Sequence, residues 1–160
     1  MIKEKDIEEL GQFIINELGK ELIKQNHRAT GKLISSLDFR VTRSPQSTDL
    51  LIEMNDYGEW VNTGRRAGAK KVPIAALVQW IKDKGIASNN KRVVGIAFAI
   101  QKKIEKEGIP TRNSRAKGKR IGFIDDTIDR ITAEINRRVL DLNFKTIEVE
   151  IDKLIASSRR

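Results

Sequence analysis

The chain has 160 residues, no cysteine and one histidine, and it carries 31 Lys and Arg residues against 22 Asp and Glu residues. This length suits one domain with a real hydrophobic core, and the lack of cysteine excludes disulfides, thiolate metal sites and cysteine nucleophiles. No apolar run approaches the roughly 20 residues that a membrane span requires, so we expect no membrane partner.

The positive charge is concentrated in the middle of the chain. Residues 61–120 contain 16 Lys and Arg against 3 Asp and Glu, a net charge of +13. The flanking residues 1–60 contain 8 against 11, and residues 121–160 contain 7 against 8. Such an uneven field attracts polyanions or acidic faces of other subunits, and charge alone does not choose between these partners.

The first third of the chain predicts two helices and a β-hairpin. Apolar residues recur at three- and four-residue steps across residues 6–25, which is typical of an amphipathic helix. Residues 31–37 predict a short helix that Thr30 can cap. The alternation around Phe39 and Val41 and the apolar run 50–54 flank a turn-rich segment, so we expect a hairpin over about 38–54.

Both tryptophans and the only tyrosine lie within residues 57–86. Trp60 and Val61 lead into a glycine-rich basic loop at about 64–72. Pro73 suits the first turn of a helix and Gly85 suits its end. A second helix is predicted over about 92–107, and its first half is apolar nearly all round, so we expect that half to lie centrally.

The last third of the chain contains a basic arm and a long apolar pattern. Residues 111–120 hold five basic residues and no acidic one, which predicts an arm that is mobile in the free protein. Asp125 and Asp126 suit the start of a helix. Beyond Phe144 the spacing fits either a helix or a strand, and the β-branched residues lead us to favour a strand at about 146–151.

Together these elements predict an α+β fold in which a small antiparallel sheet packs against several α-helices. The sheet contains the hairpin at about 38–54 and a possible extra strand at about 146–151. We expect a single domain over residues 1–160, with flexible basic loops at about 64–72 and 111–120.

No pattern in the sequence points to catalysis, a metal or a cofactor. The single histidine, His27, is better interpreted as a surface or capping residue than as a ligand. The best acidic cluster is Asp125, Asp126 and Asp129, which a magnesium nuclease would need, although adjacent aspartates at a helix start are ordinary capping. We therefore expect a non-enzymatic protein with no catalytic, metal or cofactor residues, and the nuclease is our third hypothesis.

The basic segments and the aromatic residues before them are the candidate contact sites. The cations at 65–71 can meet acidic residues of a neighbouring subunit, remain solvated, or contact phosphates, and we rank the three interpretations in that order. For the cations of the arm at 112–120 we expect an anionic partner rather than none. The aromatic pair can belong to the core or anchor an interface. We predict subunit-interface or anion-contacting roles for Tyr57, Trp60, Arg65, Arg66, Lys70, Lys71, Arg112, Arg115, Lys117, Lys119 and Arg120.

Two short motifs resemble those of a known family. One has the form T-G-x-L-x-x-S and is carried by Thr30, Gly31, Leu33 and Ser36. The other has the form Y-x-x-(aromatic)-V-x-x-G, followed by a basic loop, and is carried by Tyr57, Trp60, Val61 and Gly64. Over roughly residues 5–125, the chain thus resembles the neck or tail-completion proteins of tailed bacteriophages.

This resemblance implies an α+β virion subunit that forms a ring around the DNA channel at the head–tail junction. Its implied partners are further copies of itself, the portal or its adaptor, the tail proteins and, non-specifically, packaged DNA. It would assemble in the cytoplasm of the bacterial host and remain in the virion. The alternative function is a basic nucleic-acid-binding module, which a steep dependence of DNA affinity on salt would reveal.

Overall fold

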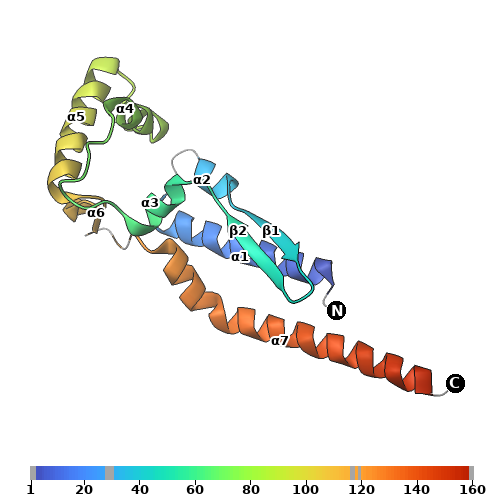
Figure 1. Ribbon diagram of the computed structural model, residues 1–160. Coiled ribbons are helices and arrows are strands. Elements are labelled where there is room, and N and C mark those ends of the chain that lie inside the picture. Colours follow the sequence, from blue (N-terminus) through green and yellow to red (C-terminus); the bar gives the residue numbers. More distant parts are fainter. Residues whose placement is uncertain (1–2, 28–30, 116–117, 119, 159–160) are drawn as a thin grey trace.

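Helices and one antiparallel hairpin make up the described part of the chain, which confirms the predicted α+β class (Figure 1). The computed structural model describes residues 3–27, 31–115, 118 and 120–158. Within these ranges, no helix is long and apolar enough to cross a membrane. In chain order the elements are α1 (Glu4–Lys24), α2 (Lys32–Ser35), β1 (Asp38–Arg43), β2 (Thr48–Glu53), α3 (Tyr57–Thr63), α4 (Ile74–Asp83), α5 (Asn90–Glu107), α6 (Arg112–Arg115) and α7 (Phe123–Ser158).

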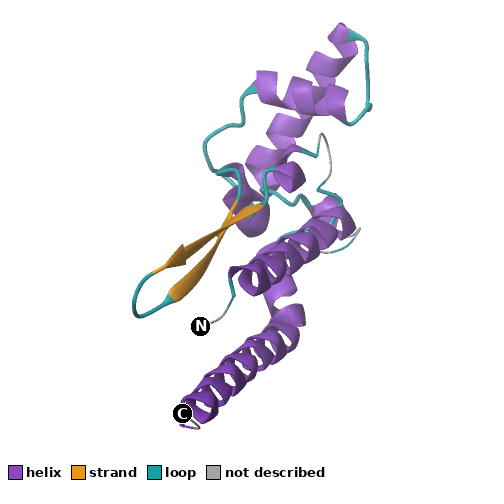
Figure 2. Ribbon diagram, turned by 90° about the vertical axis from the view of Figure 1, so that its right-hand side faces the viewer, coloured by secondary structure: helices purple, strands orange, loops and turns teal. Residues whose placement is uncertain are grey.

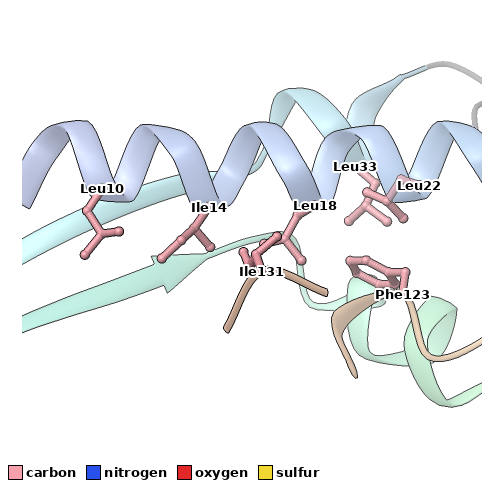
Figure 3. Close-up of a cluster of buried hydrophobic side chains, with 7 residues drawn as sticks. All are labelled: Leu10, Ile14, Leu18, Leu22, Leu33, Phe123 and Ile131. Atoms are coloured by element: carbon pink, nitrogen blue, oxygen red, sulfur yellow. The ribbon is translucent and has the colours of Figure 1, made fainter. Parts of the chain in front are cut away.

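The larger of two hydrophobic clusters forms between α1 and the beginning of α7. Figure 3 shows apolar side chains of α1, four residues apart, pointing toward two side chains of α7. A step of four residues keeps these side chains on one face of α1, which is why the amphipathic pattern predicted the helix correctly. The buried members are Leu10, Ile14, Leu18, Leu22, Leu33, Phe123 and Ile131.

The predicted hairpin is present and packs against α1. Phe39 pairs with Ile52, and Val41 pairs with Leu50. The ring of Phe39 lies against Gly11 of α1, where an added Cβ would come within 2.7 Å of the ring carbons. Gly11 therefore allows the strand to approach the helix closely, at some cost to the intrinsic stability of the helix.

A smaller cluster forms between α4 and α5, at the end of the molecule away from the hairpin (Figures 1 and 2). Leu77 and Ile81 of α4 pack against Val93, Ala97 and Ile104 of α5. The predicted boundaries are confirmed, because Pro73 directly precedes α4 and Gly85 has a positive φ of 65° just after it. This pair of helices therefore has its own core.

The expectation that the first half of α5 lies centrally is wrong. Val93 and Ala97 are fully buried, but Val94 and Phe98 are 40% and 51% exposed. The apolar residues on the opposite side of α5 from α4 remain open, because α4 is the element that packs against this half in the described chain. An all-round apolar helix predicts burial only where enough elements surround it.

The predicted strand at about 146–151 is also wrong, because these residues belong to α7. The stretch from Phe123 to Ser158 contains neither glycine nor proline, so nothing in it ends the helix. Strand propensity also depends on a neighbouring strand and a face to pack on. Thr146, a β-branched residue, adapts to the helix by donating its hydroxyl hydrogen bond to the carbonyl of Leu142 at 2.9 Å.

Candidate subunit interface

The segment that follows the hairpin forms a helix, α3, which the sequence did not predict. Gly58 is buried, and an added Cβ there would lie 2.5 Å from the sulfur of Met54 and 3.1 Å from Leu33. Tyr57 and Trp60 lie elsewhere on the helix and are 43% and 63% exposed. Neither aromatic side chain belongs to the buried core, and their exposure favours the interface interpretation over the core interpretation.

The two short motifs of the sequence meet in space. Ser36 donates its hydroxyl hydrogen bond to the carbonyl of Leu33 at 2.8 Å and accepts one from the amide of Asn55 at 3.1 Å. Leu33 in turn packs beside Gly58. Thr30 lies outside the described residues. The described part of the first motif therefore holds the start of α3 against α2.

Asn62, at the end of α3, joins this region to α7. Its side-chain oxygen accepts a hydrogen bond from the amide of Ile124 at 2.9 Å, and its carbonyl accepts one from Gly122 at 2.7 Å. The amides in the first turn of a helix have no partner within the helix, so Asn62 satisfies one of them at the start of α7. Sequence reasoning missed this role, because a cap is normally sought next to the helix that it caps.

Gly64 allows the chain to turn from α3 into the basic loop. Its φ is 75°, and an added Cβ would collide with the carbonyl oxygen of Ile109. Arg65 and Ile109 then exchange two backbone hydrogen bonds of 2.8 and 2.7 Å. The last residue of the second motif is thus explained by a close approach of two backbones.

The loop at 64–72 runs along the C-terminal half of α5. The amide of Gly68 donates to the carbonyl of Glu105 at 2.8 Å, and Gln101 donates its side-chain amide to the carbonyl of Val72 at 2.6 Å. Lys71 lies 3.6 Å from the carboxylate of Glu105. These contacts bring Arg65, Arg66, Lys70 and Lys71 to one end of α5.

The second basic segment begins at the same end of α5. Residues 112–115 form one helical turn, α6, where the sequence predicted a loop. Arg115 donates from Nε to the carbonyl of Pro110 at 3.1 Å, and the amide of Arg112 donates to the carboxylate of Glu107 at 2.8 Å. Lys117 and Lys119 lie outside the described residues.

The end of this segment is tied to α1. His27 Nε2 lies 3.0 Å from the carbonyl oxygen of Arg120, and burial lowers the pKa of His27 below 6.5. Arg120 also lines an open hollow of about 350 Å³ together with Trp80 and Lys84. The side chain of His27 therefore has a structural contact with a loop carbonyl rather than with the end of a helix.

We call the described cations of these segments the basic joint, because they lie where the chain passes between the α4–α5 pair and the rest of the molecule. Glu105 and Glu107 lie nearby, and each already contacts a residue of the joint. The excess of cations gives the joint a positive field beside the exposed aromatic residues of α3. The joint consists of Arg65, Arg66, Lys70, Lys71, Arg112, Arg115 and Arg120.

An ionic cluster joins α1 to α7, with its carboxylates buried and its cations partly exposed. Arg130 of α7 contacts the carboxylate of Glu17 and lies 3.9 Å from that of Glu21. Both carboxylates are buried. Hydrogen bonds from Lys20 and then Arg130 lower the pKa of Glu17, so the carboxylate is charged at neutral pH. This cluster attaches α7 to α1 and was not visible in the sequence, since 113 residues separate Glu17 from Arg130.

Of the acidic cluster at the start of α7, Asp126 accepts a hydrogen bond from the side-chain amide of Gln25 at 3.2 Å. Across residues 3–27, 31–115, 118 and 120–153, whose side chains are described, no three His, Cys, Asp or Glu side chains are grouped as metal ligands.

Comparison of the chain with protein-family models, curated proteins and solved structures found no match.

Proposed function

We propose that this chain is a structural subunit of a tailed-phage virion, part of the neck or of a tail-completion ring around the DNA channel. It acts by assembly: several copies form a ring that contacts the portal or its adaptor on one side and the tail on the other. The type of particle is inferred from the resemblance of the two motifs to neck or tail-completion proteins. The contacts of the motif residues support the inference that the chain is a subunit of an assembly.

One observation carries the proposal. Leu33, Ser36 and Gly64 each have a packing, hydrogen-bonding or backbone role inside the subunit. Tyr57 and Trp60 have no comparable role in the described contacts, because Trp60 is largely exposed on α3 and Tyr57 is 43% exposed. Exposed aromatic side chains are costly on an isolated protein and are enriched where subunits meet. The second motif therefore pairs residues that build the subunit with residues suited to contact another one.

The charge distribution supports the same conclusion. A ring needs two unlike faces on each subunit, because a head-to-tail contact joins different patches. The basic joint provides a cationic surface, and residues 1–60 carry an excess of 3 acidic residues, 11 against 8. Complementary charges of this kind steer subunits together and select the correct partner.

Electron microscopy and mass photometry of the purified chain test the proposal. We expect closed rings, and we expect Trp60→Ser to reduce the ring population while the thermal unfolding midpoint changes little. Leu51→Ser is the matched control, because Leu51 is 50% exposed on the hairpin. A wild-type chain that stays monomeric over the whole concentration range, alone and with portal protein, would refute the proposal.

The basic joint also supports a second candidate, a nucleic-acid-binding module. Phosphate contacts release counterions, so the logarithm of DNA affinity would fall steeply with the logarithm of salt concentration. Under this alternative, Arg66→Glu combined with Lys70→Glu would lower that slope by about one for each lost phosphate contact. Under the neck proposal, duplex DNA binds weakly and the double variant affects assembly instead.

A further inference from the structure

The C-terminal half of α7 extends beyond the rest of the molecule. In Figures 1 and 2 this part of the helix points away from α1 and the hairpin. Phe144 is 63% exposed, and Leu140, Ile147 and Ile151 are each about half exposed. Large apolar side chains on a projecting helix are the usual mark of a surface that another helix covers.

These four side chains form one continuous stripe. They follow one another at steps of four, three and four residues, which places them on the same side of the helix. The stripe differs from the one that packs on α1, because Ile131 and Ile135 occupy the opposite side of α7. The C-terminal half of α7 therefore carries a second apolar face, which the contact with α1 does not use.

The edges of this stripe are acidic. Residues 140–152 contain four acidic residues and one lysine. Asp141, Glu148 and Glu150 directly flank the stripe, where charges select the partner of a packed helix. Two copies of the same stripe would bring acidic edges together, which is unfavourable. The fitting partner is an apolar helix face with cationic edges.

α5 presents such a face. Val94 and Phe98 lie one turn apart on its exposed side, together with Gly95 and Ala99. An added Cβ at Gly95 meets no atom within 4 Å, so the backbone of another helix can approach closely there. The same side carries Lys91 and Lys102, one turn before Val94 and one turn after Phe98, and α5 as a whole holds five basic residues against two acidic ones.

We propose that the C-terminal half of α7 packs on the exposed face of α5 in a second copy of this chain. The two surfaces lie at opposite ends of the molecule in both views (Figures 1 and 2), so the contact joins separate copies. Each copy offers one surface and accepts the other, which generates a closed ring if the rotation between copies closes. This contact rests on the homo-oligomer of the proposed function and specifies how its copies join.

Disulfide trapping tests the geometry, and the chain suits it because it has no cysteine of its own. Full-length Ile147→Cys and Ala99→Cys chains, distinguished by a size tag, are mixed and gently oxidised. We expect the mixed disulfide to dominate over either symmetric one. Val149→Cys is the matched control, because Val149 is 50% exposed on the other side of the same helix, and it should give little mixed product.

Mass photometry of substituted chains measures how much the stripe and its charged edges contribute to association. We expect Phe144→Ser to weaken association about 30-fold, as loss of a central aromatic contact does. Glu148→Lys with Glu150→Lys should weaken it about tenfold, and adding Lys91→Glu and Lys102→Glu in the same chain should restore it. Circular dichroism melts separate a loss of association from a loss of folding.

Three outcomes overturn the inference. A dominant Ile147–Ile147 disulfide would mean that two α7 stripes pair with each other. Rings that persist unchanged in Phe144→Ser would mean that other surfaces join the copies, and would leave the proposed function standing. A wild-type chain that never associates would remove both proposals together.

Discussion

The two halves of α7 have similar compositions and opposite environments. In the first half Phe123 is fully buried and Ile131 is 3% exposed, whereas in the second half Phe144 is 63% exposed. Both halves carry apolar residues at helical spacing, so their intrinsic preferences do not explain the difference. The difference arises because α1 packs against the first half of α7, whereas the second half extends beyond α1.

This contrast teaches that an apolar stripe predicts a contact but not whether the partner belongs to the same chain. The first half of α7 finds its partner within the subunit and contributes to folding. The second half finds none in the described part of the chain, so its apolar side chains are available for association. Substitutions in the two halves should therefore affect different measurements.

The largest expected effect comes from Phe123→Ala. Removing a fully buried aromatic side chain should lower the free energy of unfolding by about 3–5 kcal/mol, because it exposes apolar surface and leaves a cavity. Urea denaturation at low protein concentration, where the chain is monomeric, measures this change. Phe144→Ala is the matched control and should change the monomer by no more than about 0.5 kcal/mol. Equal losses of unfolding free energy at the two positions would contradict the proposed difference between the two halves of α7.

A second comparison uses two arginines of α7 that differ in the burial of their partners. Arg130→Ala should lower the free energy of unfolding by about 2 kcal/mol, because it leaves the buried carboxylates of Glu17 and Glu21 without this cation, while Arg130 itself is partly exposed. Chemical denaturation at pH 7 gives the value. Arg137→Ala should have little effect, since Arg137 pairs with Glu134 and Asp141 on the exposed surface of its own helix.

Substitutions of Asn62 test what stabilises the start of the packed half of α7. Asn62→Ala should cost about 1 kcal/mol, because the amide of Ile124 loses its hydrogen-bond acceptor. Asn62→Asp keeps an acceptor next to the positive end of the helix and should preserve stability. Thermal melts of both variants and the wild type provide the test. If the two substitutions destabilised the chain equally, the capping role would be wrong.

The smallest expected effect is the dependence of stability on pH through His27, whose partner Arg120 precedes the packed half of α7. Burial lowers the pKa of His27 in the folded chain below 6.5, with the positive charges of Arg120 and Lys84 acting in the same direction. Between the two pKa values the unfolded chain binds more protons, so stability should decrease as pH falls below 6.5. Unfolding midpoints at pH 7.5 and 5.5 measure this loss. In His27→Asn the difference between the two midpoints should shrink.

Much of the fold could be predicted because the relevant signals are local. The alternation around Phe39 and the turn after it located the hairpin correctly. Pro73, Gly85 and Gly108 located the ends of α4 and α5, since these residues favour or require particular backbone angles. Less of the candidate site could be predicted from the sequence. The sequence singled out the basic residues and the aromatic pair, but it could not show that residues 64–72 and Arg112 meet at one end of α5.

The amino-acid sequence by itself determined the α+β class, the hairpin and most helix boundaries, because periodicity and turn residues act over a few neighbours. The tertiary structure alone decided the helical state of residues 146–151, the cap that Asn62 provides for α7, and which apolar stripes are buried. Those outcomes depend on which distant element lies against a segment, and Leu140 and Ile131 look alike until α1 covers only one of them.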